Sequence, residues 1–235
     1  MGRKAIAVAD LLDRLESHYG MQQAGFPVDP WEFLVWWHCG YPQSDARCSA
    51  GWEALKKHVG IQPAQILAAS QAQLAAALKS GGMVPELRAM RLHDIARRVH
   101  EEYSGDLNAL FTGPLAKVRA ALKRFHGIAD PGADRILLFA RVAPVAAVPS
   151  NCAHVLVRIV HGLERKNYGV TYRESQEVIE QEVPAQVHDR QRSYLLLKVH
   201  GQNVCKAKPK CDRCPVRSVC AYASGADRGG MRPGA

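Results

Sequence analysis

The sequence predicts an all-α protein made of two helical domains. Apolar residues recur at helical spacing in successive segments, and no stretch shows a convincing strand-like alternation of apolar and polar residues. With 235 residues the chain could form one large or two small domains, and we favour two. Hydrophobic residues make up 47% and charged residues 23% of the chain, a composition that indicates a packed core.

Three helices are expected in the first third of the chain. Apolar residues at helical spacing in segment 8–15 predict an amphipathic helix that ends near Gly20. The aromatic and aliphatic residues of segment 31–39 predict a buried helix. Segment 64–78 is rich in Ala, Leu and Gln and follows Pro63, which suits the first turn of a helix.

The middle of the chain predicts three more helices. Apolar positions in segment 89–99 define one helix, whose arginines form either a solvated face or a phosphate-facing one. After Pro114, segment 115–125 has a helical register, and Gly127 lies where a C-terminal cap belongs. A further helix runs through segment 136–140, so residues 126–133 should form a short hairpin loop between the two.

The last quarter predicts two helices and a tail. Thr171 and Glu174 form a candidate capping box for a helix through Ile179. Leucine-rich segment 195–199 belongs to a last long helix. Residues 224–235 are rich in Gly, Arg and Pro and are expected to be a disordered tail.

The chain is basic. Lys and Arg outnumber Asp and Glu by 31 to 22, which gives a net charge of +9 and a pI near 9.3. This bias favours polyanionic partners such as nucleic acid, through counterion release, without identifying them. No segment approaches the 18 or more apolar residues of a membrane helix, so we expect a cytoplasmic protein that is not secreted.

Four of the seven cysteines lie close together near the C-terminus. Cys205, Cys211, Cys214 and Cys220 are separated by gaps of five, two and five residues. An odd number of cysteines argues against a secreted disulfide framework, so the compact loop predicts metal ligation. The alternatives are a structural zinc site, or buried cysteines without metal. Zinc sites more often pair two Cys-x-x-Cys knuckles where this loop has one, so the spacing favours iron–sulfur.

Four stretches together resemble the endonuclease III-like helix-hairpin-helix (HhH-GPD) DNA glycosylase superfamily. HGQNVCKAKPKCDRCPVRSVC resembles its iron–sulfur loop, with a first gap one residue shorter. LKRFHGIADPGADRILLFA resembles its helix-hairpin-helix, AAVPSNCAHVLVRI its catalytic segment, and PWEFLVWWHCGYPQSDARC its early helix and damage-site loop. The resemblance spans roughly residues 30–220 and implies a 4Fe–4S cluster held by the four cysteines.

The resemblance also implies a domain layout. Residues 29–136 would form a helical-barrel domain that contains the hairpin, and residues 1–28 with 137–223 an iron–sulfur cluster domain. The two would flank a DNA-binding cleft. We expect a monomer that binds damaged double-stranded DNA and is associated with the nucleoid.

The predicted DNA contacts follow from the same resemblance. In the family, glycines let the hairpin backbone approach a phosphate, and amides at the start of the second helix donate to its oxygens. This role falls on one short segment, with the first-turn amides in residues 133–135: Gly127, Ala129, Gly132, Ala133 and Arg135. An ordinary helix–helix turn is the alternative. The side chains that enter the duplex would be Gln43, beside Pro42, and Met83 or Val84.

The sequence departs from the family at both catalytic positions. Pro131 occupies the place of the lysine that attacks the sugar, and Pro149 that of the aspartate that stabilises its positive charge. Lyase chemistry through an amine at Pro131 is therefore excluded. Asp134, Asn151 and Asp45 are the candidate substitutes for the aspartate, with Asp130 behind them. Each has a structural alternative as a turn, helix-start or capping residue.

These observations predict a monofunctional base-excision glycosylase that flips a damaged or mispaired base and hydrolyses its N-glycosidic bond. A non-catalytic relative that recognises damaged or branched DNA is the second hypothesis. A structural zinc protein is the third.

Overall fold

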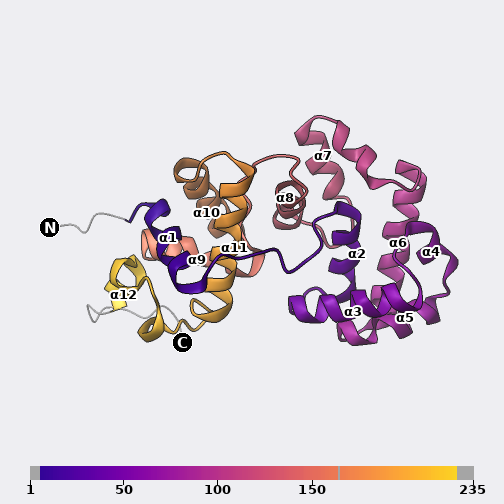
Figure 1. The fold of residues 1–235 in the computed structure, drawn as a ribbon, viewed down its shortest axis with the longest axis horizontal. Helices are drawn as coiled ribbons and strands as arrows, with labels where there is room; N and C mark the ends of the chain where they lie inside the picture. The colour runs from indigo at the N-terminus through magenta and orange to yellow at the C-terminus, as the bar shows by residue number, and fades with distance from the viewer. Residues whose placement is uncertain (1–5, 164, 227–235) are drawn as a thin grey trace. The chain divides into compact units, whose positions relative to one another are not determined.

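The computed structural model describes residues 6–163 and 165–226, and within these residues the regular structure is helical, without a strand (Figure 1). The all-α prediction is therefore confirmed. The chain divides into two compact units, one formed by Met1–Gln23 and Ala143–Ala235, and a second formed by Ala24–Val142. We call the first the cysteine unit and the second the hairpin unit. The layout with a helical-barrel domain over residues 29–136 and a cluster domain over residues 1–28 and 137–223 stays a prediction.

The hairpin unit is built around a buried helix. Its elements are α2 (Pro30–Gly40), α3 (Asp45–His58), α4 (Pro63–Ala68), α5 (Gln71–Leu78), η1 (Lys79–Gly81), α6 (Pro85–Tyr103), η2 (Leu107–Thr112), α7 (Leu115–Leu122) and α8 (Asp130–Phe139). Helix α2 begins after Asp29, whose side chain accepts from the Glu32 amide, and all but one of its residues are buried. The buried helix predicted over segment 31–39 is confirmed.

The prediction of a single helix over segment 64–78 is wrong, because the segment forms two helices, α4 and α5. Helix α4 ends at Ala68, and Ser70 then caps α5. The Gln73 side chain accepts from the Ser70 amide at 2.9 Å, which completes a capping box. The local hydrogen bonds of Ser70 thus break an apolar register that is otherwise continuous.

The hairpin also differs from its predicted boundaries. Helix α7 ends at Leu122, so Phe125 is buried in the turn and is not part of the helix. Helix α8 begins at Asp130, before the predicted loop ends. Pro131 is compatible with this early start because a first-turn residue has no intrahelical partner for its N–H.

The cysteine unit packs α1 (Val8–Tyr19) against later helices. Its other elements are η3 (Ser150–Cys152), α9 (His154–His161), α10 (Tyr168–Glu182), α11 (Val187–Asn203), η4 (Cys211–Arg213), η5 (Arg217–Val219) and α12 (Ala221–Ala226). Helix α1 contacts α10 and α11, and α9 contacts α10, α11 and α12. The predicted first helix and its end at Gly20, where φ is +73°, are confirmed.

Two predictions in this unit need correction. Asn167 caps α10, so Thr171 lies inside the helix and Glu174 instead pairs with Arg165 at 2.9 Å. Ser224 belongs to α12, so the predicted tail cannot begin there, and residues 227–235 lie outside the described residues. None of the helices in the described part of the chain is both long and apolar enough to cross a membrane.

Candidate functional site

The turn between α7 and α8 has the backbone geometry that the hairpin prediction requires. Gly127 has φ +69°, a left-handed conformation that glycine adopts without a steric penalty. The first helical hydrogen bond of α8 runs from the Ala133 amide to the Ala129 carbonyl at 3.0 Å. The amides of Asp130 and Gly132 therefore precede the helical ladder, whereas the Ala133 amide belongs to it. A phosphate contact by the amides of residues 133–135 stays a prediction.

Ion pairs brace the two helices of the hairpin. Asp134 is 1% exposed and its Oδ1 lies 2.8 Å from Arg119 Nε. Asp130 lies 2.7 Å from Lys123 Nζ and 3.5 Å from Arg119. Both aspartates of α8 thus face cations of α7 and its C-terminal end. Asp134, one of the candidate catalytic residues, therefore forms an ion pair with Arg119 that joins α8 to α7.

His38, in α2, contacts the backbone of the hairpin turn. This residue was not identified from the sequence. Its Nε2 lies 2.8 Å from the His126 carbonyl oxygen, and its Nδ1 lies 2.7 Å from the Leu34 carbonyl oxygen. Burial lowers the pKa of His38 to about 4, although both carbonyl contacts act in the opposite direction. A histidine among the apolar residues of segment 33–39 was the available sequence signal.

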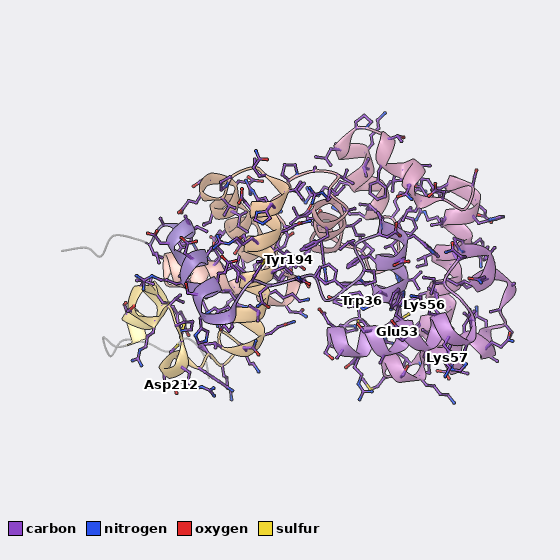
Figure 2. The ribbon with its side chains drawn as sticks, viewed as in Figure 1. Trp36, Glu53, Lys56, Lys57, Tyr194 and Asp212 are labelled. Carbon is purple, nitrogen blue, oxygen red and sulfur yellow. The ribbon has the colours of Figure 1, made fainter. Side chains whose placement is uncertain are left out.

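Arg135 is a core residue of the hairpin unit. It is 5% exposed, and its guanidinium lies 3.7 Å from the ring centre of Phe26 and 4.9 Å from that of Phe33. The rings of Trp36, labelled in Figure 2, and Trp37 surround it at 5.3 and 5.9 Å. Its side chain thus stabilises the aromatic core by cation–π contact rather than lying at the surface.

The two predicted duplex-entering segments lie next to each other. A Cβ built on Gly82 would lie 3.1 Å from the Gln43 side chain, so the loop after α2 touches the loop before α6. Met83 is 73% exposed, and the Arg88 side chain donates to its carbonyl at 2.9 Å. Val84 is 56% exposed and has φ +54°, which is strained for a β-branched residue.

Trp37 connects these loops to the hairpin. Its ring stacks on the ring of Tyr41, with the ring centroids 3.7 Å apart. Tyr41 lies two residues before Gln43, which is predicted to enter the DNA duplex. A Cβ on Gly127 would lie 3.8 Å from Trp37 Nε1. One buried side chain therefore contacts both the early loop and the hairpin turn.

The remaining catalytic candidates lie in different units. Asp45 is the first residue of α3 in the hairpin unit and is half-buried, with Ser44 as the cap. Asn151 is exposed within η3 of the cysteine unit, two residues after buried Pro149.

The four predicted metal ligands line one small cavity in the cysteine unit. Cys205 follows α11, Cys211 opens η4, Cys214 follows η4, and Cys220 precedes α12. Asp212, labelled in Figure 2, is the carboxylate of this otherwise basic loop. The structure thus brings together all four residues that the spacing selected.

Arg158 and His154, both from α9, fix the path of this loop. Arg158 is 2% exposed, and its Nη1 donates to the Lys206 carbonyl at 2.7 Å and lies 3.7 Å from Cys205 Sγ. His154 Nε2 lies 2.7 Å from the Cys205 carbonyl. These two side chains were also missed by the sequence analysis, because their partners are about 50 residues away in the chain.

Burial alone would keep three of these cysteines, Cys205, Cys214 and Cys220, protonated. It raises the pKa of the Cys214 thiol to about 11 and also raises the pKa values of Cys205 and Cys220. Backbone N–H groups at Val216 and Tyr222 act in the opposite direction on Cys214 and Cys220. Donors directed at buried sulfur suit thiolates, which a bound metal would generate. Across residues 6–163 and 165–226, no three Cys, His, Asp or Glu side chains form a site for a single metal ion.

Comparison with known proteins agrees with the motifs. No family model matches the chain. It is 25% identical over 167 residues to a Methanocaldococcus jannaschii protein named "Putative DNA repair glycosylase MJ1434", covering 71% of this chain and 74% of that one.

Solved structures share the fold over almost the whole chain. A DNA-bound covalent intermediate of endonuclease III matches with a TM-score of 0.74 and 17% identity, covering 94% of this chain and 97% of that one. A thermostable thymine-DNA glycosylase matches with a TM-score of 0.70 and 18% identity, covering 92% and 96%. The chain has the all-helical fold of endonuclease III and the related helix-hairpin-helix DNA glycosylases, as its motifs predicted.

Proposed function

We propose that this protein is a monofunctional DNA glycosylase of the endonuclease III type, which extrudes a damaged or mispaired base and hydrolyses its N-glycosidic bond. The observation that carries the proposal is a left-handed Gly127 hairpin followed by amides that precede the helical ladder, within a fold shared with a DNA-bound glycosylase. Backbone amides at a helix start are suited to a phosphate. The exposed Met83 and Val84 provide apolar side chains for base extrusion.

The absence of lyase activity follows from the start of α8. Pro131 has no amine that could attack the sugar. Lys123, a nearby amine, is engaged with Asp130 at 2.7 Å. Hydrolysis by water is therefore the proposed reaction, and it leaves an abasic site with the strand intact.

We propose that Asp45 or Asn151 takes over the role of the family aspartate, whose place is occupied by Pro149 in this chain. Asp134 is the weakest of the three candidates, because its carboxylate is buried against Arg119. Asp45 has a carboxylate that could support positive charge on the sugar or accept a proton from water. Asn151 is exposed and could orient a water molecule, but its amide cannot take the proton.

The proposed cofactor is a 4Fe–4S cluster held by Cys205, Cys211, Cys214 and Cys220. The four cysteines line one cavity. Their spacing, with a single Cys-x-x-Cys pair, favours a cluster over one zinc ion. When bound, the cluster would supply rigidity to a positively charged loop. Arg158 and His154 would hold that loop in place.

A lesion panel tests the catalytic proposal. Duplexes containing uracil, thymine glycol, mispaired adenine, hypoxanthine or alkylated bases are incubated with the protein and analysed with and without alkali. The expected result is strand cleavage of at least one lesion duplex only after alkali. Cleavage without alkali would contradict the absence of lyase activity.

A non-catalytic DNA-binding protein is the second candidate, favoured by proline at both family catalytic positions, Pro131 and Pro149. It predicts retained duplex binding and an intact base in every member of the panel. This outcome would replace the glycosylase proposal.

A further inference from the structure

A buried histidine links the end of α1 to one of the four loop cysteines. His200, in α11, is fully buried. Its Nδ1 lies 3.0 Å from the Tyr19 hydroxyl oxygen, and its Nε2 lies 3.7 Å from Cys214 Sγ. Tyr19 is the last residue of α1, about 180 residues away in the chain. Both ring nitrogens are therefore engaged by groups of known hydrogen-bonding character.

Those partners determine the direction of each hydrogen bond. A thiolate that ligates a metal can only accept, so Nε2 of His200 must carry the proton toward Cys214. In a neutral imidazole, Nδ1 then accepts, and the Tyr19 hydroxyl is the donor. The hydroxyl thereby selects the tautomer that presents an N–H group to sulfur, as outer residues do for metal-bound histidines.

We propose that Tyr19 and His200 form a hydrogen-bond relay that donates to the Cys214 sulfur and raises the reduction potential of the proposed cluster. The inference rests on the proposed cofactor. Hydrogen bonds to ligand sulfurs favour the reduced form, because they stabilise the additional negative charge that it carries. Tyr19 and His200 act through Cys214, so they are positioning residues.

The relay differs from the other contacts of the cysteines. Cys205 has the Arg158 guanidinium at 3.7 Å, and Cys220 has backbone donors. Cys214 also has a backbone donor at Val216, so the histidine adds a second. Among these contacts, the His200 donor is the one whose orientation depends on a second side chain, and Tyr19→Phe changes that side chain by a single oxygen atom.

The test uses Tyr19→Phe, which removes that oxygen, and His200→Leu, which removes the donor. Protein-film voltammetry of the iron-loaded proteins should show reduction potentials more negative than that of the wild type, with the larger shift in His200→Leu. Resonance Raman spectra should show that the Fe–S stretching shift on transfer to D₂O is smaller in both variants. His200→Gln, whose amide can donate, should recover part of each effect.

Tyr103→Phe is the matched control, because it removes a tyrosine hydroxyl in the hairpin unit and should leave both measurements unchanged. An unchanged potential and an unchanged Raman shift in Tyr19→Phe and His200→Leu, with iron at the wild-type level, would overturn the relay alone. A wild-type protein without iron or sulfide would overturn the cofactor proposal and, with it, the relay. The two failures are therefore distinguishable.

Discussion

Ala129 offers a substitution that should separate folding from DNA binding. It is exposed at the N-cap of α8, with φ −100° and ψ −172°, and it has no side chain that can cap the helix. In Ala129→Asp the new carboxylate can accept from the Gly132 amide, since Pro131 has no N–H. Such a cap stabilises a protein by about 1 kcal/mol, and repulsion from Asp130 should offset a few tenths of this.

The same carboxylate should weaken DNA binding. It takes the Gly132 amide that we assign to a phosphate, and it adds a negative charge at that position. Two like charges about 4 Å apart repel by about 1 kcal/mol in water and by about 4 kcal/mol near a protein surface. A loss of at least about tenfold in duplex affinity is therefore expected, since about 1.4 kcal/mol corresponds to a factor of ten.

Fluorescence anisotropy of a labelled duplex over a range of salt concentrations measures this effect, and urea denaturation measures the stability. Ala129→Ser is the matched control for the charge, because serine also takes the Gly132 amide but carries no charge. It should bind DNA less tightly than the wild type and more tightly than Ala129→Asp. The salt dependence of log K should fall by about one in Ala129→Asp, as for one lost phosphate contact. Equal affinity of the Asp and Ser variants would refute the assignment of the phosphate site.

Three further changes test the supports of this site. Wild-type stability should decline from pH 6.5 toward 4, because burial holds the folded pKa of His38 near 4 and the unfolded chain binds the proton more readily. In His38→Gln the loss between pH 7.5 and 5.5, measured by urea denaturation, should be smaller by about 1.3 kcal/mol, and parallel profiles would contradict this. Asp134→Asn should cost about 1–2 kcal/mol while base release stays within about threefold of wild type; a loss of orders of magnitude in single-turnover rate would instead make Asp134 catalytic. Gly81→Ala would drive a Cβ into the Cys39 carbonyl oxygen, so thermal unfolding should show a loss of about 2 kcal/mol or more, and a wild-type Tm would disprove that packing.

Features encoded by local pattern were predicted from the sequence. The density of apolar residues in segment 31–39 identified the buried helix α2. The spacing of the last four cysteines identified four residues that line one cavity. Gly127 marked the turn of the hairpin, because glycine adopts the left-handed conformation found there without a steric penalty. In each case a few neighbouring residues carry the signal.

Features that depend on distant partners could not be predicted. Nothing near His38 indicates that it will contact the His126 carbonyl, 88 residues later. The pairing of Arg119 with Asp134 requires the bend of the hairpin, which brings together two helices whose registers were separately visible. The break at Ser70 was hidden because alanine and leucine continue the apolar pattern on both sides.

Release of an intact base is the most direct test of the proposed function. Mass spectrometry of the small molecules freed from the lesion duplexes should detect one free base in an amount equal to the abasic sites formed, with the strand unbroken. Tight, salt-sensitive duplex binding with no free base from any lesion would contradict a glycosylase and leave a DNA-binding protein.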